Sequence, residues 1–288
     1  KIRTTIIEGL YENKLNELKQ QISIENYKEE VRTQSYVNYL EKHAQIARKI
    51  NLDILNLSKK KSLNEIFNHF GTDKGTKIKN PYSKNSKKKE LGHGFGKFYE
   101  KYFYKFREDR FKFLEIGTWK GASLASFYFY FKKAFIYGID RNFKNNYSSR
   151  RLEFIYCNTT NISDLRNLKK KFKNKKFKII IDDGSHLLND IISNLKFFFR
   201  MVDKKGYYVI EDFNHPKYFD HLNDSNNKEL LFDQIIKNLK QKKIFESKIL
   251  GKQDQKFLFK NIKKININKG LKLKSKKNIS DILFLEKV

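Results

Sequence analysis

Two short stretches of the chain place acids and an imidazole at the ends of apolar runs. The stretch IIIDDGSH contains Asp182, Asp183 and His186. The stretch YYVIEDF contains Glu211 and Asp212. Carboxylate oxygens suit the octahedral shell of Mg²⁺, which can polarise a hydroxyl group, and an imidazole can take up a proton near neutral pH. The residue types therefore indicate metal-assisted activation of a hydroxyl.

A plainer interpretation exists for each stretch alone. Asp-Gly is a common turn signal, and Glu-Asp can be a solvated strand end. The two stretches together, with His186, favour a site. Glu211 and Asp212 point to opposite faces of a straight strand, so the strand must end or bulge there for both acids to converge.

An earlier stretch, LEIGTWKGAS, has the features of a ligand-binding turn between a strand and a helix. Its glycines, Gly117 and Gly121, allow the backbone to approach a ligand, and a helix N-terminus supplies free N–H groups. Asp140 ends the next strand, 25 residues after Glu115. A carboxylate in that place can accept both ribose hydroxyls of a nucleoside cofactor. The alternative is that the glycines serve only tight strand-to-helix packing.

Strand-like and helix-like segments alternate from residue 111 onward, as the positioning of such a site requires. Strands are expected at 111–117, 134–140, 152–157, 177–183, 206–213, 263–269 and 281–288, and helices at 121–133, 162–172, 187–202, 228–241 and 252–261. This alternation predicts an α/β fold with a doubly wound, mostly parallel, seven-stranded sheet, whose last two strands form an antiparallel pair. Ligands bind such sheets outside the carboxyl ends of the strands.

The first part of the chain has a different pattern. Residues 1–60 carry apolar side chains at helical spacing, which predicts two or three helices in an N-terminal extension. Its role is an appendage or oligomerisation element, or alternatively a cap over the substrate. A short helix is expected at 62–70, followed by a glycine- and lysine-rich mobile segment (71–100) near the site. The second domain thus covers 61–288.

The motifs LEIGTWKGAS, IYGID, IIIDDGSH and YYVIEDF, in this order, resemble those of class I S-adenosylmethionine-dependent methyltransferases. More narrowly, they are similar to the metal-dependent sugar O-methyltransferases of macrolide biosynthesis. The upstream GTDKG…HGFGKFYEKYF is also similar to the segment that precedes the core of that family. The resemblance covers roughly residues 62–288. It implies a Rossmann-like fold, Mg²⁺ and S-adenosyl-L-methionine as cofactors, and O-methyl transfer.

The resemblance also implies a role for individual residues. Mg²⁺ would be held by Asp183, Glu211 and Asp212, and His186 would be the catalytic base. The residues expected to bind or face the cofactor are Glu115, Gly117, Thr118, Gly121, Ser123, Asp140, Asn158 and Asp182. One departure concerns CNTTN (157–161), where relatives carry GDQSD, so that Asn158 stands in place of an acid.

Other candidates have a less specific signal. His93, His215 and His221 could contact substrate or metal, but a surface or loop position is the favoured interpretation. Lys74 is either a cofactor or substrate contact or a solvated loop lysine. Trp119 is expected to pack beneath the helix that follows it. Cys157 is expected to be a small strand-end residue and not a nucleophile.

The net charge of +30 comes mainly from lysine and not from arginine. Because phosphate and base recognition favour arginine forks, we interpret this charge as a compositional bias and expect no specific nucleic-acid partner. The densest run, KKKFKNKKFK (169–178), should lie at the amino edge of the sheet. A nucleic-acid methyltransferase and a non-catalytic binding protein on the same scaffold remain the alternatives.

The expected acceptor is a small molecule, a sugar or glycosylated metabolite, and a homo-oligomer remains open. The single cysteine fits a reducing compartment, no apolar run approaches the roughly 20 residues that span a bilayer, and the first residues lack a signal-peptide pattern. We therefore expect a cytoplasmic protein without a membrane partner.

Overall fold

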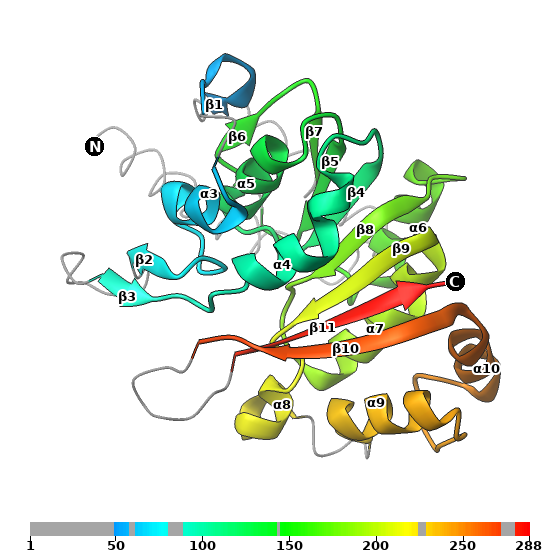
Figure 1. Cartoon of the computed structure of the whole chain (residues 1–288). Coiled ribbons are helices and arrows are strands. Elements are labelled where there is room, and N and C mark those ends of the chain that lie inside the picture. The colour runs from blue at the N-terminus through cyan, green and yellow to red at the C-terminus, as the bar shows by residue number, and fades with distance from the viewer. Residues whose placement is uncertain (1–48, 58–60, 80–88, 143–144, 224–228, 272–279) are drawn as a thin grey trace, which may run out of the picture.

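The computed structural model describes residues 49–57, 61–79, 89–142, 145–223, 229–271 and 280–288. The helices expected before residue 49 lie outside the described residues. A seven-stranded sheet forms the centre of the molecule (Figure 1). Its strands are β4 (Lys112–Ile116), β5 (Phe135–Asp140), β7 (Leu152–Tyr156), β8 (Phe177–Asp182), β9 (Val202–Glu211), β10 (Ile262–Lys269) and β11 (Asp281–Lys287). The expected strand count and positions are confirmed, although β9 begins four residues earlier than predicted.

The strand order in the sheet is β10-β11-β9-β8-β4-β5-β7. Strands β4, β5, β7, β8 and β9 pair in parallel, whereas β11 is antiparallel to both β9 and β10. The chain moves from β4 to β5 and β7 on one side, and then returns to the other side of β4 with β8. The strand order therefore reverses between β4 and β8, which is where ligands bind in doubly wound sheets.

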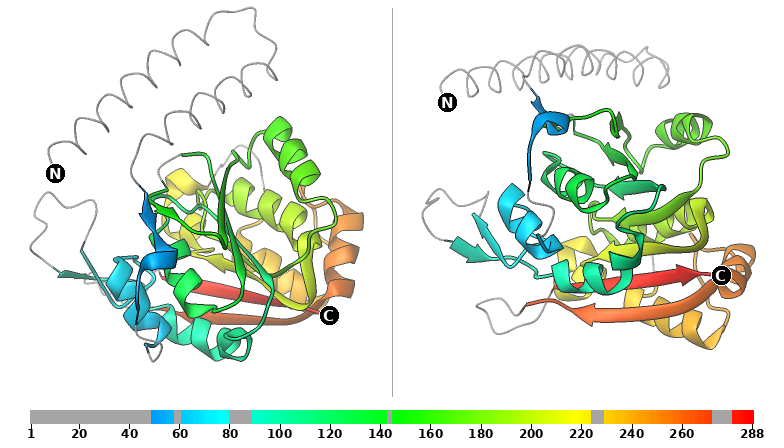
Figure 2. Two further views of the ribbon diagram at one scale, coloured as in Figure 1. Left: turned by 90° about the horizontal axis from the view of Figure 1, so that it is seen from above. Right: turned by 45° about the horizontal axis from the view of Figure 1, so that its top comes forward.

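Helices cover both faces of this sheet (Figure 2). One face carries α3 (Leu63–Phe70), α4 (Gly96–Phe103) and α5 (Ala122–Tyr130), and the other carries α6 (Ile162–Lys171), α7 (Leu188–Phe198), α9 (Phe232–Gln241) and α10 (Lys252–Asn261). Because helices cover both faces, the three consecutive isoleucines of β8 can all be buried. Ile180 packs with the second set of helices, whereas Ile179 and Ile181 pack with the first, so a fully covered strand has apolar residues on both faces.

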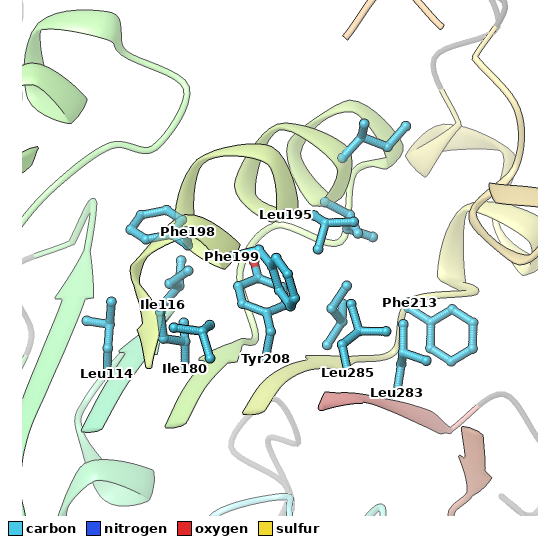
Figure 3. Packing of buried hydrophobic residues seen from close by; sticks show 14 of the residues in the cluster. Leu114, Ile116, Ile180, Leu195, Phe198, Phe199, Tyr208, Phe213, Leu283 and Leu285 are labelled. Carbon is cyan, nitrogen blue, oxygen red and sulfur yellow. The ribbon is translucent and has the colours of Figure 1, made fainter. Parts of the chain in front are cut away.

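Aromatic and branched side chains fill the layer between the sheet and α7 (Figure 3). Leu114 and Ile180 from the strands face Leu195 and Phe198 from the helix, and all four are fully buried or nearly so. Tyr208 of β9 lies in the same layer, where its hydroxyl donates to the buried Asp182. This packing fixes the directions of β8 and β9 and so the positions of the acids at their ends.

Helix α3 confirms the short helix expected at 62–70. The side chains of Ser62 and Glu65 form a capping box, and Gly71 ends the helix in the left-handed conformation (φ 74°). The chain then enters the segment expected to be mobile. Its described parts include β2 (Lys77–Lys79), β3 (Lys89–Leu91) and α4, and the antiparallel pair β2–β3 extends away from the sheet (Figure 1).

The remaining elements are short. They are β1 (Ile50–Asn51), which pairs with β6 (Tyr147–Ser148), α8 (His215–Tyr218), and 3-10 turns at 52–54, 104–106, 199–201 and 220–222. The lysine run 169–178 spans the end of α6 and the start of β8, at the amino edge of the sheet as predicted. None of the helices in the described part of the chain combines the length and apolarity that crossing a membrane requires.

Candidate active site

A pocket of about 750 Å³ opens at the carboxyl ends of the parallel strands. Its walls come from the turn after β4, the ends of β5 and β7, the loop after β8, and the loop between α3 and β2. The volume lies within the usual range for small-molecule and cofactor sites, roughly 300–1,000 Å³. The pocket therefore occupies the place where the reversed strand order predicts a ligand.

The glycine turn after β4 requires glycine for conformational and steric reasons. Gly117 has φ 81°, and a Cβ atom there would lie 2.0 Å from the carbonyl oxygen of Asp183. Gly121 has φ 82°, and a Cβ atom there would lie 2.3 Å from the side-chain oxygen of Asn145. Gly117 lines the pocket, whereas Gly121 stabilises the start of α5 behind the wall. The close approach of Gly117 to Asp183 brings the glycine turn and the acidic loop together.

Two hydroxyl residues follow Gly117 along this wall. Thr118 and Ser123 both line the pocket and are buried. The Thr118 hydroxyl has no hydrogen-bond partner among the described residues, whereas Ser123 donates to Glu115 at 2.5 Å. Thr118 thus offers a hydrogen bond to a ligand at the predicted cofactor side.

Asp140 ends β5 and lines the same side of the pocket. Its two carboxylate oxygens accept backbone N–H groups of Trp119 and Asn142, each at 2.7 Å. Burial raises the pKa of Asp140, and these backbone hydrogen bonds oppose that shift. A third backbone hydrogen bond comes from Thr118. A carboxylate has roughly four acceptor positions, so Asp140 can still accept a hydroxyl from a ligand.

Asn158 also lines the pocket, after β7. Its side-chain oxygen accepts the hydroxyl of Thr160 at 2.9 Å, and its backbone N–H donates to Asp164 at 2.8 Å. The amide of Asn158, held by Thr160, thus lies at the place where the resemblance led us to expect an acid.

Two residues expected to face the cofactor do not line the pocket. Glu115 is fully buried, accepts from Ser123, and lies 3.6 Å from the Lys74 ammonium. Asp182 is also buried and accepts from Asn194 at 3.2 Å and Tyr208 at 3.1 Å. The reason is strand alternation, because Glu115 within β4 points toward α5 and Asp182 at the end of β8 points toward α7. Burial raises the pKa of each carboxyl to about 7, against its hydrogen bonds and, for Glu115, against Lys74.

The opposite side of the pocket contains a dense group of acids around one buried cation. Lys74 is 1% exposed, and its ammonium forms ion pairs with Asp183 and, at 2.9 Å, with Glu211. Glu211 also accepts the hydroxyl of buried Tyr99. Burial lowers the pKa of Lys74, but the adjacent acids outweigh it and raise that pKa well above its ordinary value. The ammonium therefore stays protonated.

Asp183 is the acid of this group that reaches the pocket, and its side chain is 21% exposed. Burial raises its pKa, but Lys74 and His186 outweigh burial, so the net pKa is lowered and the carboxylate is ionised. Its second oxygen faces Nε2 of His186 at 3.6 Å. His186 lines the pocket with φ 57°, in the loop after β8.

Asp212 follows the end of β9 with φ 50°, which confirms that the strand ends there. Its backbone N–H donates to Asp281 at 2.7 Å, which fixes the turn. Its side chain is almost fully buried, and Oδ1 accepts no hydrogen bond among the described residues. That oxygen lies 3.7 Å from His93 and 3.6 Å from His215.

Asp212, His186 and His215 offer ligand atoms within 4.8 Å of one another, which makes them a possible metal-binding group. Burial and the neighbouring acids raise the pKa of Asp212 well above its ordinary value. A buried carboxyl with an open oxygen, next to the ionised Asp183, fits a divalent cation, because the cation would supply the charge that favours its ionised form.

The other candidate residues, three histidines and Trp119, lie in different surroundings. His93 and His215 belong to the group around Asp212, whereas His221 is exposed and contacts Phe219. Trp119 is 39% exposed and lines the pocket, so the expectation that it packs beneath the helix was wrong. Its φ of 43°, in the tight glycine turn, directs it outward.

Cys157 is buried at the end of its strand, as expected, and burial raises the pKa of its thiol to about 12.

Sequence reasoning missed the role of Tyr99, because nothing in GKFYEKYF indicates which aromatic residue will reach an acid. The sequence did not decide whether Lys74 contacts a ligand or is a solvated loop lysine. In the structure it lies inside the acid group.

The fold is that of the class I, Rossmann-like methyltransferases. Among solved structures, the chain is similar to "MycE Methyltransferase from the Mycinamycin Biosynthetic Pathway in Complex with Mg, SAH, and Mycinamycin VI". The TM-score is 0.59 at 22% identity, over 80% of this chain and 55% of that chain. A second structure of the same methyltransferase with Mg and SAH gives a TM-score of 0.57 at 22% identity, over 79% of this chain and 55% of that chain.

Among curated proteins, the chain is 30% identical to demethylmacrocin O-methyltransferase of Streptomyces fradiae over 127 residues, which are 42% of this chain and 32% of that protein. It is also 30% identical to mycinamicin VI 2''-O-methyltransferase of Micromonospora griseorubida over 127 residues, 42% of this chain and 31% of that protein. The chain thus matches about a third of the length of these relatives. No family model matches the chain.

Proposed function

We propose that this protein transfers a methyl group from S-adenosyl-L-methionine to a hydroxyl of a sugar or another small polar acceptor, with the assistance of Mg²⁺. The observation that carries the proposal is the composition of one pocket. Asp140 and the Gly117 turn border one side, and Asp183 and His186 border the other. A nucleoside donor and an activated hydroxyl can therefore meet within a single cavity.

The nucleoside part of the donor would occupy the side formed by β4, β5 and β7. Asp140 would accept ribose hydroxyls, as carboxylates at the end of the second strand do in this class of sheet. Thr118 would supply a hydrogen bond from its open hydroxyl, and the Asn158 amide would meet the base edge. Trp119 lies exposed at the pocket wall and would cover the donor from solvent.

The ligands proposed for the metal are Asp183, Glu211 and Asp212. All offer hard oxygen atoms, and Asp212 Oδ1 has no hydrogen-bond partner among the described residues. When bound, Mg²⁺ would polarise the acceptor hydroxyl and so make its proton easier to remove. The acids would hold this ion at the ends of strands β8 and β9, which pair in parallel in the sheet.

His186 would act as the general base. As the hydroxyl oxygen attacks the methyl carbon, the carbon–sulfur bond breaks, its electron pair goes to sulfur, and the proton goes to His186. Asp183 lies 3.6 Å from Nε2 and would stabilise the imidazolium that results. The remaining contribution is the alignment of donor and acceptor, which is a large part of catalysis in two-substrate reactions.

A sugar hydroxyl is the proposed acceptor because the sequence motifs resemble those of sugar O-methyltransferases and the two curated relatives are named as O-methyltransferases. The test is transfer of a labelled methyl group by the full chain to a panel of glycosides, with free sugars, catechols and RNA as alternative acceptors. We expect transfer to glycosides, its loss with EDTA and its return with Mg²⁺. Full activity in EDTA would exclude the metal, and exclusive labelling of RNA would replace the acceptor class.

A further inference from the structure

Lys74 lies in the loop between α3 and β2, yet its ammonium reaches acids from three different strands. It lies 2.9 Å from Glu211, forms a second ion pair with Asp183, and lies 3.6 Å from Glu115. Only 1% of the side chain is exposed. A buried ammonium with three acidic neighbours is a fixed part of the site and not a solvated loop charge.

The backbone around Lys74 is held as firmly as its side chain. The carbonyl of Lys74 accepts the N–H of Phe95 at 2.9 Å, and the carbonyl of Asp73 accepts that of His93 at 2.7 Å. A Cβ atom on Gly75 would lie 2.3 Å from the side-chain oxygen of Asn68, so the loop packs closely against α3. The backbone from which the Lys74 side chain extends is therefore fixed by the fold.

Lys74 occupies the oxygens that two of the proposed metal ligands would use. It contacts both carboxylate oxygens of Glu211 at 2.9 Å, and Tyr99 donates to one of them as well. Asp183 gives one oxygen to Lys74 and retains the other, which faces His186. Both oxygens of Glu211 are thus engaged. Among the described residues, Asp212 Oδ1 has no hydrogen-bond partner, and Asp183 Oδ1 lies 3.6 Å from His186.

A metal ion and this ammonium cannot both lie between Asp183 and Glu211. Magnesium binds carboxylate oxygens at about 2.0–2.1 Å, which leaves no room for a second cation on the same lone pairs. Two cations at such short range would also repel each other by several kcal/mol at the effective dielectric of a protein site. Binding of Mg²⁺ to this pair of acids must therefore displace the Lys74 ammonium.

We propose that Lys74 is an internal competitor of the metal. Its ammonium offsets part of the negative charge of Asp183 and Glu211 while the metal is absent, keeps the buried acids in place, and weakens the affinity for Mg²⁺ because it must leave when the ion enters. The inference rests on the proposed metal-assisted function. It adds a positioning residue that sets how tightly the metal binds.

The direct test is calorimetric titration of the full chain with Mg²⁺, without donor or acceptor. Lys74→Met removes the charge and retains most of the volume, and we expect it to bind Mg²⁺ at least about tenfold more tightly than the wild type. Lys74→Arg retains the charge and should bind as weakly as the wild type. Lys77→Met, an exposed lysine three residues along the same segment, is the matched control and should leave the affinity unchanged.

A second measurement uses the unmodified protein, in case Lys74→Met does not fold. Acylation of lysines by acetic anhydride, resolved by peptide mass spectrometry, should spare Lys74 without metal because it is buried. Saturating Mg²⁺ should increase the rate at Lys74 and leave that at Lys77 unchanged.

The outcomes separate this inference from the function on which it rests. Weaker or equal Mg²⁺ affinity in a folded Lys74→Met variant, or continued protection of Lys74 in the metal-bound wild type, would overturn the competition and leave the proposed reaction intact. An absence of Mg²⁺ binding in every variant would overturn both.

Discussion

The two sides of the pocket present different chemical groups. The side formed by β4, β5 and β7 presents backbone groups, hydroxyls and the single carboxylate of Asp140. On the opposite side, Asp183 lines the pocket and Lys74 pairs with it and with the buried Glu211, while Asp212 is buried at the end of β9. The first can accept a ligand without a counterion, whereas buried acids on the second require cations. The comparison suggests that the first side holds the donor and the second activates the acceptor.

The largest effect should come from removing the base on the acidic side. His186→Ala should reduce the rate of methyl transfer by about 10²–10⁴-fold, the usual contribution of general acid–base catalysis, and leave donor affinity unchanged. Initial rates with labelled donor and calorimetry of donor binding would measure the two quantities. His221→Ala, at an exposed histidine outside the pocket, is the control and should retain the wild-type rate.

Two further observations would sharpen this prediction. The His186 variant should recover part of its rate at high pH, where the acceptor loses its proton more easily. Asp183→Ala should lose at least as much rate without such recovery, because it removes a proposed metal ligand. If His186→Ala instead weakened donor binding and left the rate at saturation unchanged, the division between the two sides would be wrong.

Glu115 connects the two sides, because it accepts from Ser123 and faces Lys74. Burial raises its pKa to about 7 from 4.5, against Lys74, so the folded protein holds this proton more tightly than the unfolded chain. Its contribution to the free energy of unfolding is therefore complete below pH 4.5 and is lost as the pH rises to about 7. In Glu115→Gln, the free energy of unfolding should therefore fall by roughly 2–3 kcal/mol less than in the wild type over this pH range.

Urea unfolding at pH 5 and pH 8 would measure this difference. Glu108→Gln, at an exposed acid, should keep the pH dependence of the wild type. An identical pH dependence in Glu115→Gln and the wild type would mean that Lys74 keeps Glu115 ionised throughout.

Asp140 tests the nucleoside side alone. Asp140→Asn should weaken S-adenosyl-L-methionine binding by about 1–3 kcal/mol, the scale of a charge-assisted hydrogen bond, and should not change Mg²⁺ affinity. Calorimetric titrations with donor and with metal would check both statements. Asp73→Asn, on the opposite wall of the pocket, serves as the matched control for donor binding. Unchanged donor affinity in Asp140→Asn would remove the ribose assignment.

The smallest effect is expected at Cys157, which lines the nucleoside side. Burial raises the pKa of its thiol to about 12, so very little thiolate exists at pH 8. The native protein should react with Ellman's reagent only on the timescale of unfolding, and Cys157→Ser should change donor affinity by less than about threefold, as is usual away from specific contacts. Rapid labelling of the native protein would show that this wall opens.

Much of the fold was predictable because its signals are local. The apolar strands, the helices between them and the seven-stranded sheet follow from periodicity, and Ser62 and Glu65 begin α3 through adjacent residues. The ends of β8 and β9 were also predictable, since acids cannot continue a covered strand without a partner. The burial of Glu115 and Asp182 was not predicted, because it depends on which face each side chain meets.

The sequence by itself determined which residues could perform chemistry and on which edge of the sheet they lie. A parallel sheet places the carboxyl ends of its strands together, so Asp140, Asp183 and Glu211 had to share that edge. Only the tertiary structure decided how their charges are balanced. Lys74 lies 109 residues before Asp183 and 137 before Glu211, and no local pattern indicates that a loop lysine will be buried between them. Long-range packing of α3 and α4 against the sheet brings Lys74 and Tyr99 to these acids, because ion pairs form between side chains that packing places together, at any separation along the chain.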